Sequence, residues 1–192
     1  SSSIKLNAPL DYASQGRAVT AEDYKVYVRK LFPNTQAVSV WGGEDGSFDT
    51  STGVSSTPEY GKVFISVKST TSLNLTTSQK ENLVKDLNPY KVASITPVIV
   101  DPETTFLILG ITFNYNSSAT TQSKTDLETS VSNTIASFTD NNLEDFNLPF
   151  RHSLVTGLID DVDSAITNNT TTVTMAKFFT PSLTTSTNYT VS

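Results

Sequence analysis

This chain of 192 residues has no cysteine, one histidine, one methionine and one tryptophan. Without cysteine it forms no disulfides and lacks the thiolates that most structural zinc sites use. The lone imidazole, His152, has no second His or Cys with which to hold a metal ion. The composition therefore favours a protein that matures in a reducing compartment, and we expect no metal ligands.

Charged residues are also scarce, at 17% of the chain, and the formal net charge is -6. No run of Lys or Arg is longer than the Arg29-Lys30 pair. Such a chain repels phosphate backbones, so we expect no nucleic-acid partner. The longest apolar run, Phe106 to Phe113, is interrupted by Gly110 and Thr112 and is far shorter than the roughly 18 to 20 residues of a membrane helix. We expect no membrane partner either.

Sequence motifs of common enzyme classes are missing. No Gly-x-Ser-x-Gly elbow accompanies His152, and there is no Walker loop or dinucleotide fingerprint. His152 is thus interpreted as a surface or capping residue. The sequence predicts no catalytic and no cofactor-binding residues, and so a protein that is not an enzyme; a hydrolase that uses paired carboxylates is the minor alternative.

Two acidic clusters are the remaining candidates for chemistry. Glu44, Asp45 and Asp49 lie in a loop that departs from the EF-hand pattern, because a glycine comes too early and the final glutamate is missing. The second cluster, Asp160 to Asp163, follows a predicted helix and is expected to be a solvated turn. Neither cluster predicts a metal site.

Hydroxyl side chains are abundant: 55 of the 192 residues are Ser or Thr. Five Asn-x-Ser/Thr triplets begin at Asn74, Asn116, Asn168, Asn169 and Asn188. They favour an alternative reading as an extracellular or cell-surface binding or adhesion module. A chain this rich in Ser, Thr and Asn contains several such triplets by chance, so they do not decide between the readings.

Hydrophobic periodicity in the first half predicts helices alternating with strands. A helix begins at Thr20, whose side chain caps it together with Asp23, and Tyr24 faces inward. A second helix is capped by Ser78 with Glu81. The predicted strands are Ala37 to Trp41, Lys62 to Lys68 and Val92 to Val100, and Pro97 predicts a sheet edge or a bulge in the last of them.

The second half repeats this alternation. A strand from Thr105 to Tyr115 carries apolar residues on one face. Helices are predicted from Ser123 to Phe138 and from His152 to Asp160, the second burying Leu154, Val155, Leu158 and Ile159. Two short strands, Val162 to Ile166 and Thr172 to Phe179, are expected to follow, separated by Asn168-Asn169.

This pattern predicts an α+β fold with mainly antiparallel sheets and helices packed on one face, in two small α+β halves. We expect one half at residues 1–101, the other at 102–180, and a Ser/Thr-rich tail at 181–192.

Three segments carry a resemblance to a known family: Gly16 to Tyr24 (GRAVTAEDY), Phe32-Pro33, and Val38 to Asp45 (VSVWGGED). With them the chain resembles the baseplate J-like family, which includes the baseplate wedge subunit of T-even type phages. The resemblance implies a structural component of a contractile tail, present in the virion baseplate and assembled in the host cytoplasm. It implies contacts with other wedge subunits and with a second copy in a dimer. Since members are longer than this chain, we expect it to be a piece of a longer product.

Strand alternation points to two candidate interface residues. Val173, Met175 and Phe179 share one face of the last predicted strand and Phe178 lies on the other. Trp41 similarly lies on the face that Val38 and Val40 do not occupy. Aromatic residues are enriched in protein interfaces, so Trp41 and Phe178 are candidates for contact with another subunit. The alternative is that a second layer, such as a helix or the tail, covers this far face.

Overall fold

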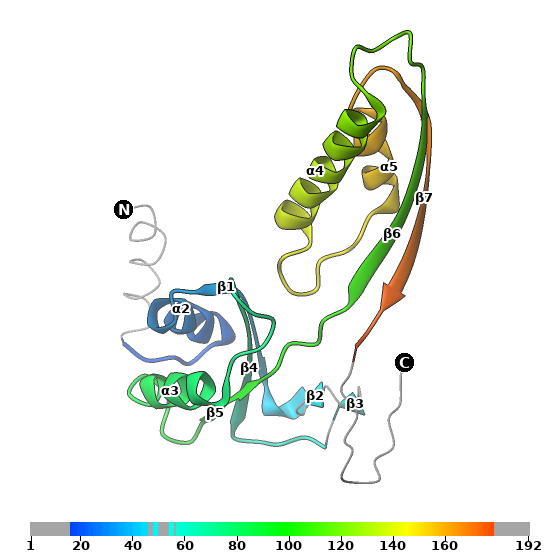
Figure 1. The fold of residues 1–192 in the computed structure, drawn as a ribbon. Helices are drawn as coiled ribbons and strands as arrows, with labels where there is room; N and C mark the ends of the chain where they lie inside the picture. The colour runs from blue at the N-terminus through cyan, green and yellow to red at the C-terminus, as the bar shows by residue number, and fades with distance from the viewer. Residues whose placement is uncertain (1–15, 46–47, 50–53, 56, 179–192) are drawn as a thin grey trace, which may run out of the picture. The chain divides into compact units, whose positions relative to one another are not determined.

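The computed structural model of the chain describes residues 16–45, 48–49, 54–55 and 57–178 (Figure 1). These residues form two compact units that divide after Thr104. Each contains a sheet covered by helices, which confirms the predicted α+β class with two small halves. The finer domain ranges, and the tail at 181–192, stay a prediction, since the tail lies outside the described residues.

The first unit is built on a sheet of three strands in the order β1-β4-β5. Strand β1 pairs antiparallel with β4, with Val38 opposite Val67, whereas β4 and β5 run parallel. Strand β5 lies at the edge of the sheet, which is one of the two outcomes predicted from Pro97. The elements of this unit are α2 (Ala21–Leu31), β1 (Thr35–Gly42), the 3-10 helix η1 (Gly43–Asp45), the short pair β2 (Phe48–Asp49) and β3 (Val54–Ser55), β4 (Lys62–Ser69), α3 (Thr77–Leu87) and β5 (Thr96–Val100).

Helices α2 and α3 cover one face of this sheet (Figure 1). Tyr24 and Val28 of α2, Leu83 and Leu87 of α3, and Ile65 of β4 belong to one buried cluster. Tyr24 is 1% exposed, which confirms its predicted inward position.

The start of α3 differs from the prediction. Thr76, not Ser78, is the N-cap, and its capping box is closed by Gln79 in place of Glu81. The sequence offers two overlapping Ser/Thr-x-x-Glu/Gln patterns two residues apart. The earlier one is used.

The second unit is a long antiparallel ribbon of β6 (Phe106–Tyr115) and β7 (Ile166–Ala176), with helices α4 (Lys124–Asn142) and α5 (His152–Asp160) on one face (Figure 1). Burial alternates along β6 as predicted, and the ribbon residues Leu109 to Tyr115 of the inner face pack against the helices. From α4, Val131 and Phe138 join this core. Ser123 is the N-cap of α4, and the helix runs four residues past the predicted end at Phe138.

The prediction of two short strands after α5 is wrong. A single strand, β7, runs through Asn168 and Asn169 and pairs with β6 from Ile166 opposite Tyr115 to Ala176 opposite Phe106. Asn114 donates a hydrogen bond of 2.8 Å from its side-chain amide to the Asn168 side-chain carbonyl. The long-range partner thus overrides the local turn preference of the Asn pair.

Helix α5 has the predicted bounds, but one predicted core residue is not buried. Val155 and Ile159 are fully buried, whereas Leu154 is 44% exposed. An amphipathic helix of nine residues turns only part of its surface to the core, and Leu154 lies outside that stripe.

Candidate interaction surfaces

The segment before α2 is held by a dense set of hydrogen bonds. The Asp23 carboxylate accepts hydrogen bonds from the backbone N–H groups of Thr20 at 2.8 Å and Val19 at 3.0 Å. The Thr20 hydroxyl accepts one from the Asp23 N–H at 3.2 Å. Partial burial raises the pKa of Asp23, but the hydrogen bonds from Thr20 and Val19 outweigh it, so the pKa lies below its ordinary value. The motif therefore fixes a helix start and supplies no reactive group.

The Gly42-Gly43 pair makes a close backbone approach possible at the end of β1. The Glu59 N–H donates to the Gly43 carbonyl at 2.7 Å. A Cβ atom at Gly43 would collide with the Glu59 carbonyl oxygen, and one at Gly42 would collide with the Glu44 carboxylate. Gly42 and Gly43 thus have a structural role, because they join β1 to the loop before β4.

Trp41 is half-buried and stacks on Phe64, its cross-strand partner in β4, with ring centroids 5.9 Å apart. Val38 and Val40 belong to the core under α2 and α3, so Trp41 lies on the opposite face of the sheet. Its role as an interface residue stays a prediction.

Phe178 lies two residues beyond the end of β7, not within a strand as predicted, so the alternation argument does not apply to it. Phe179, which was predicted to lie on the opposite face of the strand from Phe178, lies outside the described residues. Phe178 is 75% exposed and meets the edge of Phe106 with centroids 5.1 Å apart. Ile108 and Met175 are also exposed, at 54% and 74%. Phe106, Ile108 and Phe178 form an apolar group that we term the ribbon tip, whereas Met175 pairs with Leu107 and so lies on the other face of the ribbon.

The only histidine and the second acidic cluster make hydrogen bonds that hold the fold together. His152 Nε2 lies 2.9 Å from the Thr171 carbonyl and so ties α5 to β7. The Asp160 carboxylate accepts a hydrogen bond from the Asn169 amide at 2.7 Å, and Asp163 accepts one from the Ala165 N–H at 2.8 Å. Each group is used to position a helix or strand end.

The remaining sequence candidates do not converge on a site in the described residues. Within them, no three His, Asp or Glu side chains gather where they could hold a metal ion. The side chain of Asp49, in the first acidic cluster, and the triplet at Asn188 lie outside what is described. Likewise, none of the helices in the described ranges has the length and apolar character needed to cross a bilayer.

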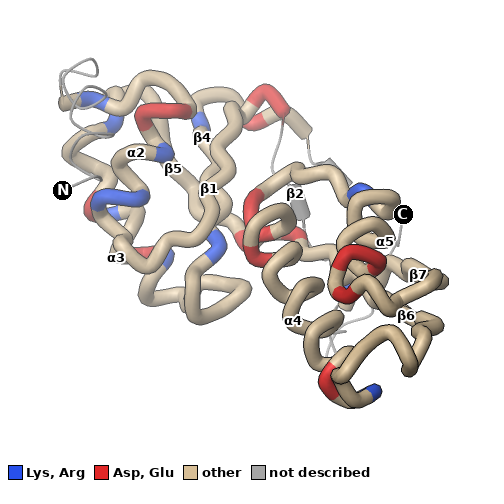
Figure 2. The backbone as a smooth tube through the Cα atoms, turned by 90° about the horizontal axis from the view of Figure 1, so that it is seen from above, with Lys and Arg blue, Asp and Glu red and all other residues tan. Residues whose placement is uncertain are grey.

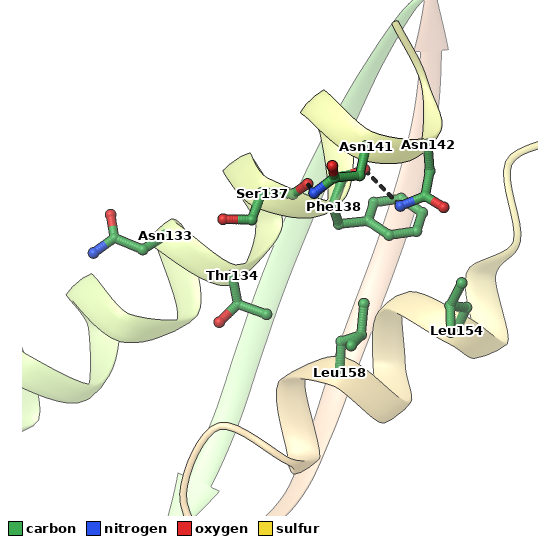
Figure 3. Close-up of a pocket in the computed structure, with 8 residues that line it drawn as sticks. All are labelled: Asn133, Thr134, Ser137, Phe138, Asn141, Asn142, Leu154 and Leu158. Carbon is green, nitrogen blue, oxygen red and sulfur yellow. Dashed lines mark hydrogen bonds between the residues drawn. The ribbon is translucent and has the colours of Figure 1, made fainter. Parts of the chain in front are cut away.

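An open groove between α4 and α5 was missed from the sequence. It encloses about 490 Å³ and is lined by Asn133, Thr134, Ser137, Phe138, Asn141 and Asn142 of α4 and by Leu154 and Leu158 of α5 (Figure 3). Leu154 was predicted to lie in the core, whereas it is an exposed apolar residue at the edge of this groove. No local sequence signal distinguishes a groove leucine from a core leucine on the same short helix.

Comparison with known families decides the relationship. Residues 20–100 match the family model of baseplate structural protein gp6, C-terminal domain I. Residues 103–178 match that of baseplate structural protein gp6, C-terminal domain III. The chain belongs to the gp6 family of baseplate structural proteins. The resemblance to a baseplate wedge family is thereby confirmed, with the gp6 domains as its description.

One curated protein is similar in sequence to this chain, and one solved structure is similar to it in fold. Baseplate wedge protein gp6 of Enterobacteria phage T4 is 30% identical over 165 residues, covering 85% of this chain and 23% of that protein. A chain in the cryo-EM structure of the anti-feeding prophage baseplate has the same fold, with a TM-score of 0.56 at 9% identity. It covers 91% of this chain and 37% of that chain. This chain thus spans less than a quarter of the T4 protein.

Proposed function

We propose that this chain is a structural component of the baseplate wedge of a contractile phage tail, located in the virion and assembled in the host cytoplasm. The match of residues 20–100 and 103–178 to gp6 C-terminal domains I and III is the observation that carries the proposal. The first match lies within one compact unit, and the second covers nearly the whole of the other. Both halves are therefore related to baseplate protein, which a chance match of one motif does not explain.

The way ionisable side chains are used supports a structural role and no catalytic one. Asp23, Asp126 and Asp163 accept hydrogen bonds at the starts of helices or turns. His152 binds a backbone carbonyl. Catalysis generally needs such groups held near a substrate with a shifted pKa, and these are committed to local structure.

We also propose that the chain acts through contacts with other wedge subunits and with a second copy of itself, in a dimer. Phe178 is our first candidate for such a contact, because it is a large exposed aromatic within the ribbon tip. Trp41 is the second candidate, since it lies on the sheet face opposite the two helices. Aromatic side chains of this kind supply much of the binding energy of protein interfaces.

The location is tested by the composition of purified particles. Tails and heads from the contractile-tailed particles that carry this sequence are separated, and peptides of the chain are quantified by mass spectrometry. We expect the peptides in the tail fraction, at a constant ratio to the tail-sheath protein. Their absence from tails, or their presence in the host envelope fraction instead, would favour the adhesion-module alternative.

Self-association is tested by light scattering of the purified chain over a range of concentrations. We expect the dimer fraction to rise with concentration and to fall in Phe178→Ser. Tyr60→Ser is the matched control, because Tyr60 is an exposed aromatic of the first unit, at 82%. A wild type that stays monomeric throughout refutes self-association of this chain. Trp41→Ala is measured in parallel. A variant that unfolds, in place of a folded variant that dissociates, would assign Trp41 to the core.

A further inference from the structure

The α4–α5 groove combines apolar and neutral polar side chains. Leu154 and Leu158 of α5 lie along one side, and Asn and Ser side chains of α4 lie along the other (Figure 3). Phe138, which is 5% exposed, also lines it. Leu154 is 44% exposed and is not among the residues of the core cluster of this unit. Leu154 thus adds exposed apolar surface at the edge of a hollow, which is the kind of surface that marks binding grooves.

The lining favours a helix as the occupant over an extended chain. The amide of Asn141 donates to the Ser137 carbonyl at 2.7 Å, and that of Asn142 donates to the Phe138 carbonyl at 2.9 Å. One N–H of each amide is thus already used, and the sides of α4 and α5 present no free backbone groups for pairing. An extended segment buried here would leave its own N–H and C=O groups without partners. A helix satisfies those groups internally and packs its side chains between two others.

Charge distinguishes between possible partners. Residues 105–178 contain eight acidic and three basic side chains, and so a formal charge of -5, out of -6 for the whole chain. Figure 2 shows acidic segments beside both α4 and α5. On α4, Asp140 lies one turn from Ser137 of the groove, and Asp161 follows Leu158 by three residues at the end of α5. A second copy would bring like charge to this surface, whereas a basic partner is attracted to it.

We propose that the α4–α5 groove binds an amphipathic helix of another protein, with leucine-like residues toward Leu154 and Leu158 and Lys or Arg on its flanks. The groove residues of α4 span 133–142, which at 1.5 Å per residue corresponds to a contact of about three helical turns. The proposal deepens the proposed function, since the partner helix belongs to another baseplate subunit.

The test uses a synthetic Leu/Lys peptide of about 18 residues, long enough to form a helix, with Leu at i, i+3, i+4 and i+7 spacing. It is titrated into the isotope-labelled 192-residue chain, and amide shifts are followed by NMR. We expect the shifts to map to α4 and α5 around Asn133, Leu154 and Leu158. A peptide of the same composition in scrambled order, and one with Glu in place of Lys, should bind about tenfold more weakly or not at all.

Two leucine variants separate specific docking from general attraction to an acidic protein. Leu154→Ser should weaken binding of the Leu/Lys peptide about tenfold without changing the thermal midpoint. Leu73→Ser is the matched control, because Leu73 is also 44% exposed but lies in the first unit. Equal binding by the scrambled peptide, shifts confined to the outer face of β6, or no effect of Leu154→Ser would overturn the proposal. Such a result leaves the quantification in purified tails untouched, so the two failures are distinguishable.

Discussion

Replacing Tyr24 by Phe removes one atom from the core of the first unit, and the structure predicts that stability rises. Tyr24 is 1% exposed, and its hydroxyl oxygen is buried with no hydrogen-bond partner among the residues that the structure describes. Burial without compensation also raises the pKa of this phenol. A buried polar group with no partner costs about 1 to 3 kcal/mol, and Phe keeps the ring that fills the site. We expect Tyr24→Phe to gain about 1 kcal/mol of unfolding free energy.

Tyr24→Ala removes the ring as well and leaves a cavity between α2, α3 and the sheet. Large aromatic-to-alanine changes in cores cost about 3 to 5 kcal/mol, so we expect a loss of about 3 kcal/mol once the unpartnered hydroxyl is discounted. The unfolding free energy is expected to rise in Tyr24→Phe and to fall in Tyr24→Ala. The two variants therefore separate the effect of the buried hydroxyl from that of the packed ring.

Trp41 is the single tryptophan of the chain and lies in the same unit, so its fluorescence reports urea unfolding of that unit. For a slope of about 2 kcal/mol/M, Tyr24→Phe should raise the midpoint by about 0.5 M and Tyr24→Ala should lower it by about 1.5 M. Tyr60→Phe, at an exposed position, is the control and should leave it unchanged. A loss of more than about 1 kcal/mol in Tyr24→Phe would show that the hydroxyl has a partner, and the reasoning would be wrong.

Three further predictions follow from helix caps and glycines. Thr20→Ala should cost about 1 kcal/mol in urea unfolding, because the cap of α2 is lost; an unchanged midpoint would contradict this. Because the folded pKa of Asp23 is lowered, its contribution is complete above the unfolded pKa of about 3.9 and is lost as pH falls through the folded value. Asp23→Asn should thus be less stable than wild type at pH 6, and the two should become equally stable in acid. A stability difference that does not change with pH would show that the charge of Asp23 does not cause it. In thermal melts, Gly43→Ala should destabilise by several kcal/mol through its collision with Glu59, whereas Gly157→Ala, with open space in α5, should gain about 0.5 to 1 kcal/mol. Similar effects at both glycines would refute the close-approach argument.

Local signals in the sequence were sufficient for much of the fold. Thr20 with Asp23 closes the predicted box at the start of α2, and α4 begins after Ser123, where its helix was expected. Capping depends on residues three apart, so the sequence shows where a cap can form, although at α3 two such patterns overlap and the earlier one is used. The alternation along β6 has a similarly local cause, since one face of the strand meets the helices and the other faces solvent.

Features that depend on distant partners were not predicted. β7 is one strand because it pairs with β6, whose residues lie 51 to 70 positions earlier in the chain, and local turn preferences at Asn168-Asn169 cannot indicate this pairing. The parallel pairing of β4 with β5 likewise depends on how the chain crosses over through α3.

Interaction surfaces were the hardest to predict. An amphipathic pattern predicts that a leucine is buried in the core. Only the packing of α4 against α5 shows that Leu154 lies at a groove. For Phe178, the sequence reasoning selected an exposed aromatic, but through a strand that ends before it. Its exposure follows from the end of β7 and not from strand alternation.

A cryo-EM reconstruction of the baseplate, from particles that carry this sequence, tests the central claim most directly. The account predicts density for residues 16–104 and 105–178 in every wedge, with each unit fitting as a rigid body. It also predicts that other subunits bury the ribbon tip or the α4–α5 groove. A complete baseplate map in which all density belongs to other chains would contradict the assignment of this protein to the wedge.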